Sequence, residues 1–285
     1  MTAQLLEGGP VAEILLEDIR ARVKALTLRG VTPGLGTILV GSDSASMGYI
    51  RKKHETCKKV GIKSLHVHLT AEDSQVALGE VVSAFNSDPA IHAYIIQHPV
   101  PEGFDFNAAL SQMDPLKDAD GIHPTNLGKL VLQEAGPLPC TPAGIQAMFV
   151  HYGINIAGKH VVIVGRGPTL GRPLSLLLTT KNEGANAAVT VVHSAIDPIT
   201  DFTRRADVLV AAVGIPGFVT PSMVKPGAVV VSGGISWEGK KLLADVDESV
   251  EGVASWVTPR LGGVGPTTVA MLLRNTVEAA ERSVA

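Results

Sequence analysis

The sequence predicts an α/β protein of two domains, each built on a parallel sheet covered by helices. Three observations lead to this prediction. Short apolar, β-branched runs alternate with amphipathic helical stretches in both halves of the 285 residues. A proline-rich segment, 137–142, separates the halves. A glycine-rich turn directly follows one apolar strand of the second half, as in doubly wound folds.

The first half alternates strands with helices. We expect helices at 11–28, 46–60 and 74–86, with Ser46 as the N-cap of the second helix, and strands at 35–40, 64–69 and 93–96. In the second half we expect a linking helix at 144–152, strands at 160–164, 188–194, 208–213 and 228–231, and a last helix at 267–281. The β-α-β-α-β order favours parallel strands.

Composition excludes several classes of protein. Hydrophobic residues make up 45% of the chain and the formal net charge is −3, so the protein is globular and no nucleic-acid partner is expected. Apolar runs are short and interrupted, so no membrane partner is expected either. The two cysteines, Cys57 and Cys140, show no metal or redox spacing, and together with the lack of a secretory signal they favour the cytoplasm. We expect no metal site.

The glycine-rich turn predicts an anion site. His160–Val164 reads as a buried strand, and Gly165, Gly167 and Gly171 follow it before an apolar helix. Such a turn lets backbone approach a pyrophosphate, whose charge the helix N-terminus favours. The spacing has one residue more than the usual dinucleotide fingerprint, so an ordinary glycine-rich turn stays an alternative.

The next strand indicates which dinucleotide binds. NAD-preferring enzymes usually carry an acidic residue near the end of this strand. Here the strand ends in His193 and Ser194, and the next acidic residue is Asp197. Arg166 lies inside the turn, where its guanidinium can pair with a 2′-phosphate. We therefore expect NADP, with a solvated loop arginine as the alternative reading.

Three segments of the first half contain candidate catalytic or binding residues. Tyr49 and Lys53 share one face of the predicted helix 46–60, and a lysine in a cleft can transfer protons. Gln97 follows the strand 93–96, where ligands of parallel sheets bind. Asp118 and Asp120 lie in a turn without the ligand pattern of a calcium loop, which suits recognition of an amino-pyrimidine-like edge better than a metal. A solvated basic helix face, a strand-end cap and turn-forming aspartates are the alternatives.

In order, these motifs resemble the bifunctional methylenetetrahydrofolate dehydrogenase/methenyltetrahydrofolate cyclohydrolase family over about residues 35 to 276. The matching segments are Ser46-x-x-Tyr49-x-x-x-Lys53, Gln97-x-Pro99-x-Pro101, Lys117-Asp118-Ala119-Asp120-Gly121, Pro139-Cys140-Thr141-Pro142, the Gly165–Pro173 turn, His193-Ser194 and Gly262-Gly263-Val264-Gly265-Pro266. The resemblance implies a folate-binding catalytic domain at 1–143, completed by the C-terminal helix 267–285, and a Rossmann-type NADP-binding domain at 144–266.

The resemblance also implies residue roles and partners. Lys53 would be catalytic, with Tyr49 and Gln97 orienting it. The substrate, a tetrahydrofolate derivative, would be bound by Tyr49, Lys53, Gln97, Asp120, Gly262, Gly263 and Pro266. The cofactor NADP would be bound by Gly165, Arg166, Gly167, Gly171, His193, Ser194, Gly214 and Ile235. The family implies a homodimer formed through the cofactor domain.

Several positions depart from the family's pattern. His98 and Val100 replace a leucine pair, and Gly167 stands where serine is common. Ser232-Gly-Gly-Ile-Ser236 stands where the family usually has D-V-G-I-N, and Arg260-Leu261 stands where the family usually has a proline. We expect a bifunctional enzyme that oxidises 5,10-methylenetetrahydrofolate with NADP and hydrolyses the methenyl product to 10-formyltetrahydrofolate. The alternatives are a dehydrogenase without cyclohydrolase activity and a non-catalytic NADP- or folate-binding paralogue; a shikimate-type dehydrogenase leaves 117–128 unexplained.

Overall fold

The fold comes from a computed structural model, which describes residues 2–238 and 241–284. Two compact units make up the chain. One holds the segment up to Ala12 together with Pro139–Thr268, and the other holds Glu13–Leu138 together with the segment from Val269 on. The helices α1 (Gly8–Leu28) and α9 (Val264–Arg282) each belong to both units. The domain boundaries expected from the sequence stay a prediction.

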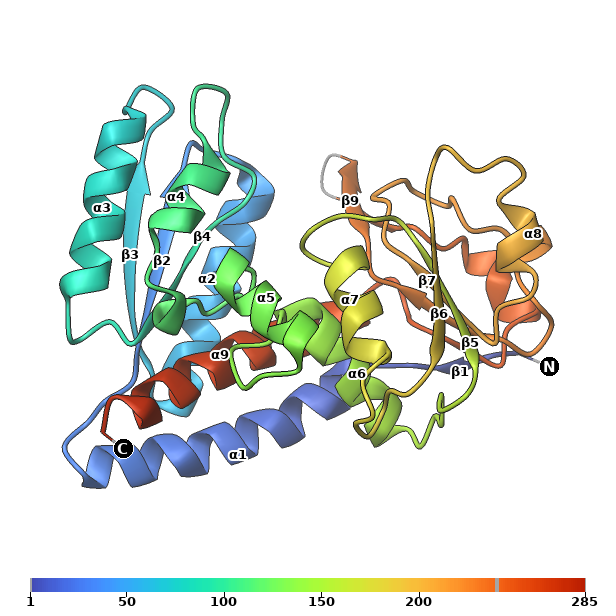
Figure 1. The fold of residues 1–285 in the computed structure, drawn as a ribbon, viewed down its shortest axis with the longest axis horizontal. Coiled ribbons are helices and arrows are strands. Elements are labelled where there is room, and N and C mark those ends of the chain that lie inside the picture. The colour runs from blue at the N-terminus through green and yellow to red at the C-terminus, as the bar shows by residue number, and fades with distance from the viewer. Residues whose placement is uncertain (1, 239–240, 285) are drawn as a thin grey trace. The chain divides into compact units, whose positions relative to one another are not determined.

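The unit containing Glu13–Leu138 is built on a parallel sheet with the strand order β3-β2-β4. Its strands are β2 (Gly34–Val40), β3 (Lys63–Leu69) and β4 (Ala93–Ile96) (Figure 1). The helices α3 (Gln75–Ser87) and α4 (Phe106–Gln112) pack their apolar side chains onto β2 and β4, whereas α2 (Ser44–Val60) packs against β2 and β3. The helices of this unit, besides parts of α1 and α9, are α2 (Ser44–Val60), α3 (Gln75–Ser87), α4 (Phe106–Gln112), η1 (Pro115–Lys117) and α5 (Pro124–Leu132).

The other unit is built on a larger parallel sheet, with the strand order β1-β11-β8-β7-β5-β6. Its strands are β1 (Gln4–Leu5), β5 (His160–Val164), β6 (Ala188–Val192), β7 (Val208–Ala211), β8 (Val229–Ser232) and β11 (Trp256–Val257) (Figure 1). An antiparallel hairpin pairs β9 (Ile235–Glu238) with β10 (Lys241–Ala244). The remaining elements are α6 (Cys140–His151), α7 (Gly171–Leu178), α8 (Thr200–Thr203), η2 (Pro221–Met223) and η3 (Glu248–Gly252).

The predicted α/β class with parallel sheets is confirmed. The near-continuous apolar runs of β5, β7 and β8 are buried, as strands covered on both faces require. The segment up to Ala12 groups with Pro139–Thr268, and β1 in this segment pairs with β11. In the described part of the chain, no helix has the length and apolar character needed to cross a bilayer.

One local prediction is wrong. Ser46 does not cap α2, because the helix starts two residues earlier, at Ser44. Asp43 is the N-cap instead: its side chain accepts a hydrogen bond from the Ser46 amide at 2.7 Å. An aspartate stabilises a helix start both through this bond and through its charge, so it competes well with a serine nearby.

Candidate functional site

Three of the predicted side chains meet at one end of the three-stranded sheet. Tyr49 and Lys53 lie one turn apart on α2, and Gln97 follows the last residue of β4. Lys53 Nζ donates a hydrogen bond to Gln97 Oε1 at 3.1 Å and lies 4.5 Å from the centre of the Tyr49 ring. The Lys53 side chain is buried, with 5% exposed. Burial, an amide acceptor and an aromatic face therefore confine one amino group to one place.

Local structure explains why these side chains converge. The Asp43 cap starts α2, and Gly61, in the left-handed conformation with φ of 84°, ends it. The Gln97 amide continues the ladder of β4 by donating to Ile38 O at 2.8 Å. Gln97 Nε2 donates to His98 O at 2.9 Å, which turns the side-chain oxygen of Gln97 towards Lys53.

A cysteine lies directly beneath this group but is unsuited to chemistry. Cys57 follows Lys53 by one helical turn and its side chain is completely buried. Burial raises the pKa of the Cys57 thiol to about 12, although the charge of Lys53 acts in the opposite direction. The thiol is therefore protonated at neutral pH and serves as a packing residue.

The two aspartates of the 117–121 segment have different environments. Asp118 is buried and its carboxylate accepts three hydrogen bonds, from the amides of Gly121 (2.9 Å) and His123 (2.7 Å) and from Asn126 Nδ2 (2.9 Å). Burial raises the pKa of Asp118, and these hydrogen bonds oppose that shift. Asp120 is half-buried, and its carboxylate forms no hydrogen bond or ion pair within residues 2–238 and 241–284. Asp118 therefore holds the turn, which leaves the oxygens of Asp120 available.

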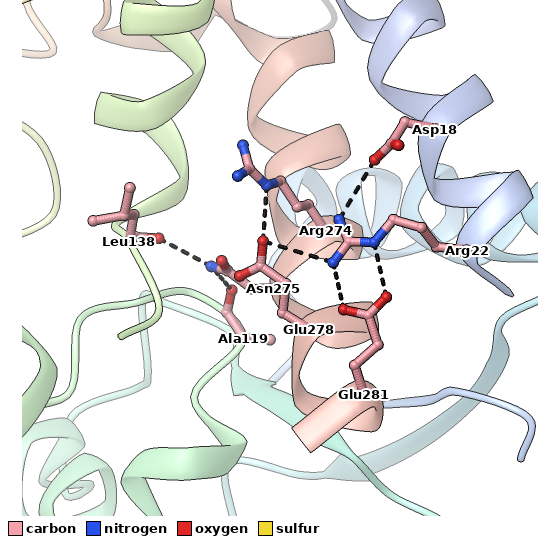
Figure 2. Close-up of polar contacts among 8 residues, drawn as sticks. All are labelled: Asp18, Arg22, Ala119, Leu138, Arg274, Asn275, Glu278 and Glu281. Carbon is pink, nitrogen blue, oxygen red and sulfur yellow. Dashed lines mark hydrogen bonds and ion pairs between the residues drawn. The ribbon is translucent and has the colours of Figure 1, made fainter. Parts of the chain in front are cut away.

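The turn that carries Asp120 is fixed from two sides. A parallel bridge joins Asp118 to Tyr94, and the Ala119 amide donates to Tyr94 O at 3.1 Å, so the turn runs beside β4 towards the end that carries Gln97. Figure 2 shows the second support, which comes from α9: Asn275 Nδ2 donates to Ala119 O and to Leu138 O, both at 2.9 Å. A buried asparagine thus ties the peptide between the two aspartates to the C-terminal helix.

In the other unit, the glycine turn has the compact form that an anion site requires. A Cβ on Gly165 would lie 2.2 Å from Ala212 O, and a Cβ on Gly171 would lie 2.2 Å from Gly165 O, so only glycine fits at either position. At Gly167 a Cβ would meet nothing within 4 Å, which leaves open space above the turn. No side chain caps α7. In its first turn Pro173 has no N–H and the Arg172 amide donates to Gly167 O at 3.1 Å, so the Gly171 amide is the group left to bind an oxyanion.

The candidate residues for a 2′-phosphate lie at neighbouring strand ends. The Gly165 amide donates to Val192 O at 2.8 Å, so Arg166 follows directly after the contact between β5 and β6. β6 ends at Val192, two residues before the expected end, and His193 and Ser194 start the loop after it. Arg166 and Ser194 are exposed, and His193 is half-buried. Exposed cationic and hydroxyl groups at this edge suit a phosphate group.

The remaining predicted residues lie in loops or at the starts of elements in the same unit. Gly214 follows β7 and has a φ of 67°. Ile235 begins β9, and its side chain lies outside the described residues. Gly262 and Gly263 precede α9 and Pro266 lies in its first turn, and Gly262 O accepts a hydrogen bond from the Gly8 amide at 2.8 Å.

The segments that depart from the family's pattern are well connected. Ser232 Oγ accepts a hydrogen bond from the Asp245 amide at 3.0 Å, and Ser236 Oγ donates to Gly214 O at 2.8 Å. Arg260 Nη1 donates to Leu242 O at 2.9 Å, which anchors the closing loop to β10. The structure also adds Asp245 and Asn275, two buried polar residues. The sequence pattern gives no signal for either, because Asp247 follows Asp245 closely and Arg274 and Thr276 flank Asn275.

The described residues contain no group of three or more His, Cys, Asp or Glu side chains that could hold a metal ion.

Comparisons with known proteins agree with both halves of this arrangement. Two family models match: the tetrahydrofolate dehydrogenase/cyclohydrolase catalytic domain over residues 6–120 and the NAD(P)-binding domain of the same enzymes over residues 139–284. The bifunctional protein FolD of Syntrophotalea carbinolica is 65% identical over 281 residues, which cover 99% of this chain and 97% of that protein.

Solved structures are similar along the whole chain. The bifunctional enzyme FolD, a methylenetetrahydrofolate dehydrogenase/cyclohydrolase from Campylobacter jejuni, has 36% identity and a TM-score of 0.93, with 99% of each chain covered. The N5,N10-methylenetetrahydrofolate dehydrogenase-cyclohydrolase of Trypanosoma brucei, complexed with NADP cofactor and inhibitor, has 36% identity and a TM-score of 0.93, with 100% of this chain and 99% of that chain covered.

Proposed function

Because the chain belongs to the tetrahydrofolate dehydrogenase/cyclohydrolase family, we propose which of its residues carry each of the two reactions in the family name. The protein is a bifunctional enzyme. It oxidises 5,10-methylenetetrahydrofolate to the methenyl compound with NADP, and it hydrolyses that product to 10-formyltetrahydrofolate. The buried Lys53 amino group, held between Gln97 and Tyr49, is the observation that supports the assignment of the hydrolytic step.

The residues of the glycine turn fit NADP. The open space at Gly167 and the Gly171 amide at the uncapped start of α7 suit the pyrophosphate, and the exposed Arg166 supplies a guanidinium for the 2′-phosphate. When bound there, NADP would supply the acceptor for the hydride from the bridging carbon of the folate. The two nitrogens next to that carbon stabilise the cation that forms, so the protein has only to hold the two reactants in line.

Hydrolysis needs proton transfers, and Lys53 is the group placed for them. Water adds its oxygen to the methenyl carbon and releases one proton to the solvent, which leaves a hydroxyl group on that carbon. The bond from that carbon to N5 then breaks while the hydroxyl loses its proton to become the formyl C=O, N5 takes up a proton, and the formyl group stays on N10. Lys53 carries the proton from the water towards N5, Gln97 holds the Lys53 amino group in place, and Tyr49 packs against it.

Asp120 is the residue that we propose to anchor the folate ring, because its carboxylate is half-buried and Asp118 already holds the turn. An ionised carboxylate pairs with an amino group and a neighbouring ring N–H. Gly262, Gly263 and Pro266 are proposed to contribute to the same substrate. Assembly as a homodimer and a place in the cytoplasm are further proposals, which rest on the family resemblance.

One assay tests the function as a whole. The purified protein receives 5,10-methylenetetrahydrofolate with NADP or with NAD, and reduced cofactor and methenyltetrahydrofolate are followed together. We expect faster reduction of NADP than of NAD, with little methenyl compound accumulating. Stoichiometric methenyl accumulation would instead identify a dehydrogenase without cyclohydrolase activity, and absence of turnover would identify a binding paralogue.

A further inference from the structure

A buried carboxylate lies under the loop that follows β7. Asp245 is completely buried, and its Oδ2 accepts hydrogen bonds from the amides of Val213 (2.8 Å) and Gly214 (3.0 Å). Among the described residues it forms no ion pair, so backbone amides alone balance its charge. Burial raises the pKa of Asp245, and the amides of the 213–215 loop oppose that rise. Burying a carboxylate without a cationic partner costs folding free energy, so a function of Asp245 would explain its presence at this position.

The same loop is also held from its other side. Ser236 Oγ donates to Gly214 O at 2.8 Å, so both backbone groups of Gly214 have a side-chain partner. The Asp245 backbone joins the arrangement, because its amide donates to Ser232 Oγ at 3.0 Å and its carbonyl accepts from the Val219 amide at 2.9 Å.

Glycine makes the close approach of the carboxylate possible. A Cβ on Gly234 would lie 2.0 Å from Asp245 Oδ2, so no other residue fits at this position without displacing the carboxylate. Gly233 is similarly close to Leu170 of the cofactor turn, where a Cβ would lie 2.5 Å from Leu170 Cδ2. The segment 232–236 therefore packs against both Asp245 and the cofactor turn.

The 213–215 loop lies next to the proposed cofactor site. The loop leaves β7 at the carboxyl edge of the parallel sheet, which is where such sheets bind ligands. It is also in contact with the glycine turn, because Gly165 approaches Ala212 O too closely for any side chain. A shift of the 213–215 loop would consequently change the surface next to the glycine turn.

We propose that Asp245 is a positioning residue for NADP: it fixes the 213–215 loop through the Val213 and Gly214 amides, and Ser236 completes the hold on Gly214. This inference rests on the proposed NADP site. Asp245 touches the loop and not the cofactor. Ser232 and Ser236 depart from the family's pattern, and both take part in this arrangement. Ser232 Oγ accepts from the Asp245 amide, and Ser236 Oγ donates to Gly214 O.

The test compares the affinities of two ligands in the same variants. Calorimetry measures the Kd of NADP and of a folate analogue for the parent protein and for Asp245→Ala. We expect the Kd of NADP to rise about tenfold, which corresponds to the loss of about one good hydrogen bond, and the Kd of the folate analogue to stay within about twofold. Asp245→Asn should recover most of the NADP affinity, since one amide oxygen can accept from both backbone amides.

Three results would overturn the proposal: an unchanged NADP Kd in a folded Asp245→Ala variant, equal weakening of both ligands, or an Asp245→Asn variant as weak as Asp245→Ala. Equal weakening is what a purely structural role predicts. A parent protein that binds folate analogue but no NADP would refute the NADP site itself, which is a distinguishable outcome.

A second variant keeps the test valid if Asp245→Ala does not fold. Ser236→Ala removes one half-buried hydroxyl, and we expect it to weaken NADP about threefold, again without an effect on the folate analogue. Ser255→Ala is the matched control, because Ser255 Oγ makes a similar bond, to Ala228 O at 3.3 Å, at the opposite ends of the strands. Equal NADP affinity of Ser236→Ala and Ser255→Ala would contradict the proposal.

Discussion

At the residue scale, Asp118 and Asp120 show how burial separates the roles of two identical side chains. Asp118 accepts two amide hydrogen bonds, from Gly121 and His123, and one from the Asn126 side chain on α5. Asp120 is more exposed, and its charge contributes to raising the pKa of Asp118. One carboxylate therefore holds the backbone, and its neighbour can bind a ligand.

The two aspartates should respond differently to amidation. Asp120→Asn should weaken binding of a folate analogue by about tenfold or more, because a charge-assisted hydrogen bond is lost, and should leave NADP binding and stability unchanged. Asp118→Asn should instead lower the free energy of unfolding by about 1–3 kcal/mol, since a buried acceptor of three bonds is altered. Calorimetry and urea unfolding of both variants check this. Folate affinity lost only in Asp118→Asn would reverse the assignment.

Arg166 is the residue that should select the cofactor. Arg166→Ala should weaken NADP by about ten- to a hundredfold, the value of a charge-assisted contact of roughly 1.5–3 kcal/mol, and should affect NAD much less because NAD lacks the 2′-phosphate. Steady-state kinetics with both cofactors measure the difference. Equal losses for NADP and NAD would remove Arg166 from the phosphate site.

At the scale of elements, α1 and α9 are joined by an ion-paired cluster (Figure 2). Arg22 of α1 donates to both carboxylate oxygens of Glu281 on α9, with Nε at 2.9 Å and Nη2 at 2.6 Å. The hydrogen bonds from Arg22 lower the pKa of Glu281, despite some desolvation. A lowered folded-state pKa means that the carboxylate stabilises the fold above its unfolded pKa and loses that effect as pH falls through the folded pKa.

The lowered pKa of Glu281 leads to a prediction about the pH dependence of stability. Glu281→Gln should reduce the free energy of unfolding near neutral pH by up to about 1 kcal/mol, the value of a partly exposed ion pair. The difference from the parent should shrink as pH falls below about 4.3, the unfolded pKa of a glutamate, and vanish below the folded pKa. Urea unfolding across this range measures it, with Glu17→Gln, an exposed change on α1, as control. A difference that persisted in strong acid would exclude the ion pair as its source.

Elements with strong local signals could be predicted from the sequence, and those set by distant partners could not. β5 and β4 are continuous β-branched or apolar runs, so their bounds matched the prediction. β1 and β11 have two residues each and exist because they pair with each other and with β8, which no local pattern reveals. The short helices α4 and α5 lie among prolines, glycines and aspartates, so their periodicity was too brief to detect.

The candidate site divides in the same way. The spacing of Tyr49 and Lys53 predicts a shared helix face, and the strand end predicts the place of Gln97. The hydrogen bond between Asn275 and Ala119 joins residues that are 156 positions apart in the sequence, and the one between Asp245 and Gly214 joins residues that are 31 positions apart. Such supports depend on tertiary packing, so periodicity and motif spacing carry no information about them.

At the scale of the whole molecule, one chain combines a hydride transfer and a hydrolysis that make different demands on the protein. Hydride transfer draws on the substrate's own nitrogens and on alignment with the cofactor. Hydrolysis requires a group that carries a proton, and the described part of the chain brings together Lys53, Gln97 and Tyr49, the residues that we propose for this role. The central claim is therefore that the two activities can be separated at Lys53.

The most direct test follows methenyltetrahydrofolate during turnover by Lys53→Gln, supplied with methylene substrate and NADP. We predict that hydrolysis is abolished while part of the dehydrogenase activity remains, so that the methenyl compound accumulates in step with NADPH. Tyr49→Phe should slow hydrolysis less, because the amino group stays. If Lys53→Gln hydrolysed methenyl substrate at the parent rate, the proposed mechanism would be wrong, and Lys53 would be a buried lysine with no part in proton transfer.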